Sequence, residues 1–285
     1  MKYIGIVGSG VEAAAIARLC AQAQFDVVLY DVNDTLLRRA LERMKGEFRE
    51  ELKRGSITQA QVTGSLDRIH PRTHIDGLSH CDLILEMVTE DLRVKRDMLM
   101  HLEATARSTT ILISTSTRFS ISSIASAAKK PDRVLGVHFL FPMNSSKVVE
   151  LVPTTDTIEE TIQRTSEFLL KLRKQPILVK DSPGSIVGRL TRIYYGEAIR
   201  ILHENVAGVN TIDSIMKSIG GFPQGPFAKL DEIGLDVDLQ QTQALFEQTS
   251  GDERYRPHPL QKQMVESGKL GKKTERGFYP YPTRV

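Results

Sequence analysis

Short apolar runs alternate with longer amphipathic stretches through residues 1–180 of the chain. A short apolar run bounded by turn residues indicates a buried strand, whereas apolar positions three and four apart indicate a helix with one buried face. Alternation of the two at this spacing predicts a largely parallel sheet covered by helices on both faces. The expected strands span residues 3–8, 26–30, 81–88, 109–115, 133–140 and 148–153, and the expected helices span 12–24, 34–54 and 92–107.

The helix expected from Asp34 is long, and a second polar stretch at residues 54–68 follows it directly. This arrangement predicts a helical hairpin inserted into a doubly wound α/β fold.

The pattern changes after Pro183 and Gly184, where convincing strand signals stop and helical periodicity takes over. We therefore predict two domains, a Rossmann-type α/β domain at residues 1–181 and an all-helical domain at 182–285. The aromatic, Pro-rich segment 276–282 is expected to pack on other residues. The expected helical stretches of the second domain are residues 185–206, 211–220, 228–250 and 259–271.

Composition narrows the class of protein. With 40% hydrophobic and 26% charged residues, the chain of 285 residues reads as a globular protein, and it lacks the 18-residue apolar run of a membrane span. The N-terminal segment lacks the apolar core of a signal peptide, and the two cysteines are too few for a disulfide framework or a zinc site. We expect a cytoplasmic protein without a metal. A net charge of +3, without basic clusters among aromatics, gives no indication of nucleic-acid binding.

A glycine-rich turn joins the first expected strand to the first expected helix. Gly8, Gly10 and Ala13 form a G-x-G-x-x-A pattern, in which the first glycine permits a tight turn and the second admits a pyrophosphate. A small third residue lets the helix and strand pack closely, so that the helix N-terminus is available to an anion. This context predicts a dinucleotide site, although Glu12 places a carboxylate in the first turn, where the pyrophosphate would lie.

The type of dinucleotide is indicated by Asp31, which ends the second expected strand 21 residues after Gly10. A carboxylate there hydrogen-bonds the adenosine ribose and repels a 2′-phosphate, so the pattern favours NAD over NADP. The alternative is that Asp31 and Asn33 are turn or capping residues of the next helix.

The segment "HFLFPMNSSKVVE" interrupts two apolar runs, beginning at His138 and ending at Glu150. One interpretation is a surface loop between strands with a structural histidine. The other is that the loop returns the chain so that Glu150 orients His138, which then accepts or donates a proton.

Longer motifs extend these observations over nearly the whole chain: "GIVGSGVEAAAIA", "LEMVTEDLRVKRDML", "SISSIA", "DRVLGVHF", "KDSPGSIVGRL", "GFPQGPFAKLDEIGLD" and "GKLGKKTERGFYPY". The chain in this respect resembles the L-3-hydroxyacyl-CoA dehydrogenase family. The resemblance implies an NAD-binding N-terminal domain, a helical C-terminal domain that usually dimerises, and an acyl-CoA substrate.

The resemblance also assigns roles to individual residues. It implies that His138 is the catalytic base, that Glu150 is its partner, and that Thr117 occupies the position of a substrate-contacting serine at the catalytic centre. Glu90 matches an acid near the nicotinamide, with a charge at a helix N-terminus as the alternative. On the expected hairpin, Lys45 and Lys53 (with Arg54 beside it) fall where the family binds the nucleotide end of CoA. A solvated helix face is an equally open interpretation of these cations.

Several positions depart from the family pattern. Phe141 and Gly188 replace asparagines, Thr115 replaces a third asparagine, and Ser185 replaces a phenylalanine. Losing a preorganised donor commonly costs on the order of 100- to 1000-fold in rate. We therefore expect a working dehydrogenase with an altered acyl pocket lined by Phe141 and Gly188.

Three functions remain open from the sequence. The leading one is NAD-dependent oxidation of the 3-hydroxyl of a 3-hydroxyacyl-CoA. The second is a dehydrogenase of a free 3-hydroxy acid of the sugar-acid or carnitine type. The third is a non-catalytic NAD- or acyl-CoA-binding partner subunit.

Overall fold

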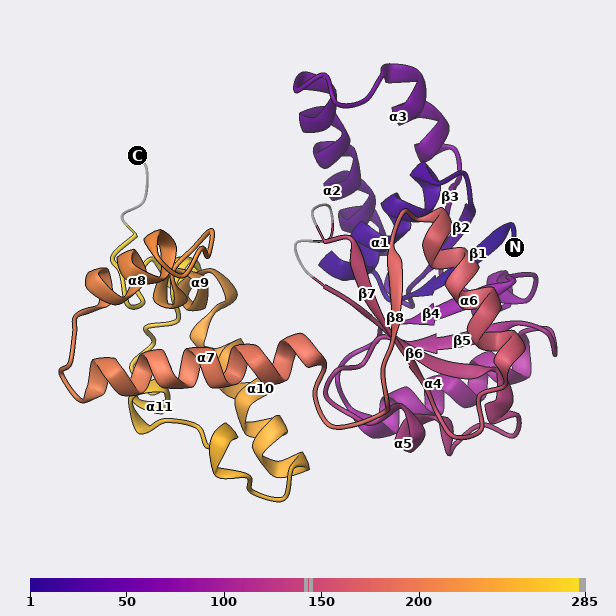
Figure 1. Ribbon diagram of the computed structural model, residues 1–285. Coiled ribbons are helices and arrows are strands. Elements are labelled where there is room, and N and C mark those ends of the chain that lie inside the picture. The colour runs from indigo at the N-terminus through magenta and orange to yellow at the C-terminus, as the bar shows by residue number, and fades with distance from the viewer. Residues whose placement is uncertain (141–142, 144–145, 282–285) are drawn as a thin grey trace. The chain divides into compact units, whose positions relative to one another are not determined.

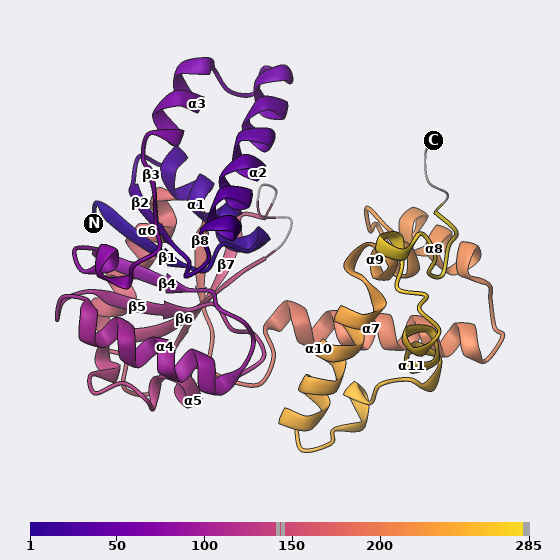
Figure 2. The same ribbon diagram turned by 180° about the vertical axis from the view of Figure 1, so that it is seen from behind.

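The computed structural model describes residues 1–140, 143 and 146–281. The chain forms two compact units, Met1–Ser182 (the sheet unit) and Pro183–Val285 (the helical unit). Figures 1 and 2 show the sheet unit in indigo to pink and the helical unit in orange to yellow.

The sheet unit is built on one eight-stranded sheet of order β3-β2-β1-β4-β5-β6-β7-β8. Strands β1 to β6 are parallel, β7 pairs antiparallel with β6, and β8 runs parallel to β7. The strand order reverses between β1 and β4. In such a sheet, the loops after the carboxyl ends of the parallel strands lie at one edge, and ligands bind beside the point of reversal. The strands are β1 (Tyr3–Val7), β2 (Asp26–Tyr30), β3 (Ile69–Arg72), β4 (Leu83–Glu86), β5 (Ile111–Ser114), β6 (Val134–Phe139), β7 (Val148–Pro153) and β8 (Gln175–Leu178).

Helices cover both faces of this sheet. Helices α1 (Val11–Gln22) and α6 (Glu159–Lys171) contribute to one apolar cluster, in which Phe25 and Phe168 pack 5.4 Å apart. Helices α4 (Leu92–Thr105) and α5 (Ile121–Ala125) contribute to the cluster on the opposite face. These contacts confirm the predicted doubly wound fold.

The predicted helical hairpin is present as α2 (Asp34–Lys53) and α3 (Gln59–Leu66), which stand side by side beyond the β3 end of the sheet (Figures 1 and 2). The buried Arg18 of α1 holds it, because its guanidinium lies 3.1 Å from Glu47 and 2.6 Å from Glu51 on α2. The hairpin is thus fixed to the helix that begins at the glycine-rich turn.

The helical unit has its own core, in which Phe227 packs 4.5 Å from Phe278. One predicted helix, residues 228–250, is two helices, because Gly234 adopts φ +96° and ends the first. The helices are α7 (Ile186–His203), α8 (Val209–Ser218), α9 (Pro226–Ile233), α10 (Leu235–Gln248) and α11 (Pro259–Glu266).

The aromatic C-terminal segment is held by two buried carboxylates of the helical unit. Asp231 accepts hydrogen bonds from the backbone N–H groups of Phe278 and Tyr279, both at 2.9 Å, and from the Tyr281 hydroxyl at 3.0 Å. Asp213 accepts one from the Tyr279 hydroxyl at 2.9 Å. Burial raises the pKa of Tyr279 and of Tyr281, and the neighbouring carboxylates raise both values further.

No helix in the described part of the chain combines the length and the hydropathy that crossing a bilayer requires.

Candidate active site

The turn after β1 has the geometry that a dinucleotide requires. Gly8 adopts φ +103°, and a Cβ there would lie 2.7 Å from the Met87 carbonyl oxygen. Gly10 is the N-cap of α1 without a side-chain cap, and a Cβ on it would meet no atom within 4 Å. Ala13 is buried against the sheet. The N-terminus of α1 is therefore open to an anion, as the pyrophosphate of NAD requires.

Asp31 follows β2 and faces this turn. Its carboxylate accepts a hydrogen bond from the Ser9 hydroxyl at 2.6 Å and from the Asn33 N–H at 3.0 Å. The capping role belongs to Asn33, which is the N-cap of α2. Asp31 lies beside the glycine turn, where a ribose-binding carboxylate is expected. Ser9, which the sequence analysis did not single out, orients this carboxylate.

Glu12 is an unusual residue for this site, since it lies in the first turn of α1. Partial desolvation, followed by the nearby Glu90 carboxylate, raises its pKa. An ionised carboxylate at this position would oppose a pyrophosphate bound at the N-terminus of α1, and protonation would relieve the repulsion.

Exchanging this carboxyl for an amide should strengthen cofactor binding. Above its raised pKa, Glu12 is negative, so we expect Glu12→Gln to lower the Kd for NAD about threefold to tenfold at pH 8, or ~1 kcal/mol. The gain should shrink as pH falls through the pKa of Glu12, because the wild-type side chain then becomes neutral. Calorimetric titration with NAD at pH 5 and pH 8 measures both values. Equal affinities of the two proteins at pH 8 would show that Glu12 points away from the cofactor.

His138 and Glu150 lie directly opposite each other in the antiparallel pair β6–β7. His138 Nδ1 lies 3.0 Å from Glu150 Oε2, and both side chains are buried. The register of two strands fixes this contact. The buried Lys174 holds the intervening segment by donating to the carbonyls of Met143 and Ser146, and burial lowers its pKa.

The second ring nitrogen of His138 also has a partner. Nε2 lies 2.8 Å from the backbone carbonyl of Ser116, in the segment after β5. A carbonyl only accepts hydrogen bonds, so Nε2 is the donor in this contact.

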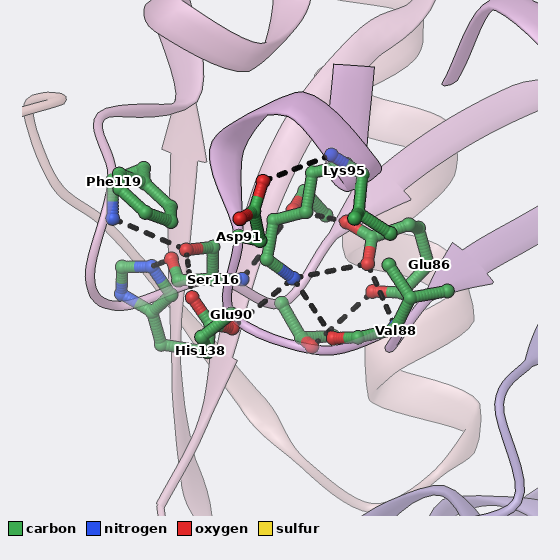
Figure 3. A network of polar contacts seen from close by, with 11 residues as sticks. Glu86, Val88, Glu90, Asp91, Lys95, Ser116, Phe119 and His138 are labelled. Carbon is green, nitrogen blue, oxygen red and sulfur yellow. Dashed lines mark hydrogen bonds and ion pairs between the residues drawn. The ribbon is translucent and has the colours of Figure 1, made fainter. Parts of the chain in front are cut away.

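Glu90 lies between two residues that sequence analysis did not identify. Its Oε1 is 3.1 Å from the ammonium of Lys95, and its Oε2 accepts from the Ser116 hydroxyl at 2.8 Å (Figure 3). Lys95 also pairs at 3.0 Å with Glu86, the last residue of β4. The sequence did indicate that Lys95 is buried, because its spacing from Leu99 and Leu102 places all three on one face of α4.

The remaining predicted residues have varied positions. Thr117 directly follows Ser116 and is exposed. Lys45 and Lys53 are exposed and pair with Glu42 at 2.7 Å and with Glu50 at 2.8 Å on their own helix. Phe141 lies outside the described residues.

Gly188 belongs to the helical unit, in the first turn of α7. The Ser185 hydroxyl caps this helix by accepting from the Gly188 N–H at 2.9 Å, and a Cβ on Gly188 would lie 2.9 Å from the same oxygen. The two departures from the family pattern therefore fit each other locally, since the missing side chain leaves room for the cap.

Among the residues that the structure describes, no group of three or more His, Cys, Asp or Glu side chains could hold a metal ion.

Comparison with known proteins agrees with this geometry. Residues 3–182 match the model of the 3-hydroxyacyl-CoA dehydrogenase NAD-binding domain, and residues 184–281 match that of the 3-hydroxyacyl-CoA dehydrogenase C-terminal domain. A 3-hydroxybutyryl-CoA dehydrogenase of Bradyrhizobium diazoefficiens is 37% identical over 281 residues, covering 99% of this chain and 96% of the relative. The human mitochondrial hydroxyacyl-coenzyme A dehydrogenase is 33% identical, with coverage of 99% and 91%.

Among solved structures, the (S)-3-hydroxybutyryl-CoA dehydrogenase of Ralstonia eutropha superposes with a TM-score of 0.94 at 32% identity, covering 99% of this chain and all of that one. The two family models together span nearly the whole sequence, and the Bradyrhizobium and human relatives align over 96% and 91% of their own length. The chain belongs to the 3-hydroxyacyl-CoA dehydrogenase family.

Proposed function

We propose that this protein oxidises the 3-hydroxyl of a 3-hydroxyacyl-CoA to the 3-oxoacyl-CoA with NAD, reversibly, and that the His138–Glu150 pair transfers the proton. The buried contact between these two side chains is the observation that carries the proposal. Family membership supplies the class of substrate and the cofactor.

The residues divide the chemistry between them. NAD, when bound, accepts hydride from C3 of the substrate. His138 Nε2 takes the proton of the 3-hydroxyl in oxidation and returns it to the 3-oxygen in reduction. Glu150 holds Nδ1–H, fixes the ring orientation and stabilises the imidazolium that forms. Gly8, Gly10 and Asp31 would hold the dinucleotide, which would supply the hydride acceptor for this reaction.

The acyl pocket and the CoA contact complete the proposal. We assign Phe141 and Gly188 to the acyl pocket, where they would replace amides by an aromatic wall and open space and so favour a bulkier acyl group. Thr117 keeps a hydroxyl for the substrate. Lys45 and Lys53 are assigned to the CoA phosphates, which would displace the exposed glutamates with which they now pair.

The quaternary structure and location are also proposals. Ile186, Leu190 and Ile193 form an exposed apolar stripe on α7, which supports a homodimer formed through the helical unit. Sedimentation of the intact chain tests this assignment. A cytoplasmic location agrees with Cys20 and Cys81, which are both free thiols.

One assay separates the candidate functions. NADH oxidation is followed with acetoacetyl-CoA, with longer and aromatic 3-oxoacyl-CoAs, and with free 3-oxo acids. We expect turnover of CoA thioesters, with the best chain bulkier than acetoacetyl. Turnover of free acids alone would replace the proposal by a free-acid dehydrogenase. NADH binding without turnover of any substrate would indicate a binding subunit.

A further inference from the structure

A lysine is fully buried in the sheet unit, beside the carboxyl ends of β4 and β5. The Lys95 ammonium has three acceptors: Glu86 Oε1 at 3.0 Å, Glu90 Oε1 at 3.1 Å and the Val88 carbonyl at 3.3 Å. An ammonium group has three N–H donors, so each of them is used. A buried charge with every donor satisfied is held in one place, because any displacement would leave the charge unpaired.

The two carboxylates at this lysine have different surroundings. Glu86 is buried, and it also accepts from the Val88 N–H and from the Ser114 hydroxyl, both at 2.8 Å. It is the fixed counter-ion. The side chain of Glu90 is 42% exposed, and its second oxygen accepts from the Ser116 hydroxyl. Glu90 therefore connects the buried lysine to the segment after β5.

Ser116 passes this constraint on to His138. Its hydroxyl donates to Glu90 and accepts from the Phe119 N–H at 3.1 Å, while its own carbonyl accepts from His138 Nε2 at 2.8 Å. Ser116 has no exposed surface. Figure 3 shows the resulting chain, which runs from Glu86 and Lys95 through Glu90 and Ser116 to the ring of His138.

We propose that Lys95 and Ser116 are positioning residues for the proton-transfer step, holding the Ser116 carbonyl as an internal acceptor for His138 Nε2 until the substrate's 3-oxygen reaches that nitrogen. The proposal rests on the function assigned to His138 above. His138 Nε2 contacts the Ser116 carbonyl and Nδ1 contacts the Glu150 carboxylate, so both ring nitrogens have a partner. The Ser116 carbonyl thus keeps the ring in one orientation before the substrate binds.

The charged groups around the ring come from several elements. Glu150 on β7 faces Nδ1, and Glu90 lies beyond Ser116 on the side of Nε2, with Lys95 and Glu86 behind it. On α1, burial raises the pKa of Glu12, and the charge of Glu90 raises it further.

The test compares Ser116→Ala, Lys95→Met and the double variant in the reduction of acetoacetyl-CoA or the best thioester found. Each single change should lower kcat at least tenfold, with the KM for NADH within about threefold of wild type, because the glycine turn is untouched. If both residues act through one chain, the double variant should be no slower than the slower single variant. If the fold-losses in kcat of the two single variants multiplied in the double variant, the two residues would act independently and the proposal would be overturned.

A matched control removes another buried hydroxyl. Thr110 donates to the Cys81 carbonyl at 2.7 Å, before the first residue of β5 and so away from the carboxyl ends of the strands. Thr110→Val should keep wild-type kcat while losing a comparable hydrogen bond. If Lys95→Met does not fold, the kcat of Ser116→Ala is compared with that of Thr110→Val alone, and equal values would contradict the proposal.

A spectroscopic measurement is independent of turnover. In ligand-free protein with ¹⁵N-labelled histidine, and with His138→Asn to assign the signals, Nε2 of His138 should be protonated at neutral pH with a slowly exchanging proton. Ser116→Ala should speed this exchange at least tenfold, and Thr110→Val should not. Unchanged exchange in Ser116→Ala would refute the positioning role even if the enzyme is active. If the wild-type protein were inactive toward every thioester, the proposed function would be refuted. The exchange measurement would still show whether Ser116 holds its carbonyl against His138 Nε2.

Discussion

Replacing His138 by asparagine is expected to lower kcat about 1000-fold while leaving the Kd for NAD within about twofold of wild type. Positioned proton transfer contributes on the order of 100- to 10,000-fold. Asparagine can place its amide N–H near the position of Nδ1, so Glu150 keeps a donor and the buried carboxylate is not left unpaired. What is lost is Nε2, the atom assigned to the substrate. Steady-state kinetics with the best thioester, together with NAD titration, measure both quantities.

Glu150→Gln is the companion of this experiment. It retains a hydrogen-bonding side chain but removes the charge that stabilises the imidazolium, so we expect a loss of about 100-fold in kcat. The thermal midpoints of both variants are needed to exclude unfolding. If His138→Asn kept more than a tenth of the wild-type kcat, proton transfer by His138 would be ruled out.

The second large effect is expected in the helical unit. Asp231 is buried, and it accepts hydrogen bonds from two backbone N–H groups and the Tyr281 hydroxyl of the C-terminal segment. Asp231→Ala would leave these donors without an acceptor and leave a cavity beside Gly277, where a Cβ would overlap a carboxylate oxygen of Asp231. We expect the free energy of unfolding of this unit to fall by about 3–5 kcal/mol.

Urea denaturation followed by circular dichroism measures this loss, since the chain has no tryptophan to report fluorescence. Protease cleavage within residues 276–281 should rise in parallel, because these residues are held by Asp231. Glu266→Ala, which removes an exposed carboxylate on α11, serves as the control and should change stability by less than about 0.5 kcal/mol. A loss below 1 kcal/mol in Asp231→Ala would show that the segment is held by its aromatic packing instead.

Sequence patterns predicted the central part of the sheet because its strands are buried on both faces and therefore consist of continuous apolar runs. The edge strands were missed for the corresponding reason. Strand β3, "IHPR", contains a proline and mostly polar residues, and β8, "QPIL", begins with a polar residue followed by a proline. Such residues are tolerated at an edge, where one side of the backbone needs no partner.

The site was predictable as far as local spacing and family motifs reach. His138 and Glu150 lie on strands that the patterns located, and Asp31 and the glycine turn lie at the ends of such strands. Lys95 was missed because a lysine within a helix ordinarily indicates a solvated face, even though its spacing from Leu99 and Leu102 is that of a buried position. Only the fold shows that it lies between two carboxylates. The helix break at Gly234 likewise depends on a backbone angle that composition does not reveal.

The antiparallel pairing of β6 with β7 has a consequence for how this family could diversify. Cross-strand register sets the distance between His138 and Glu150. Substitutions or insertions between the two strands therefore need not separate this pair, provided that the strand register is preserved. Exchanging the residues between these strands for those of a relative would therefore test their part in acyl specificity while the His138–Glu150 contact is kept.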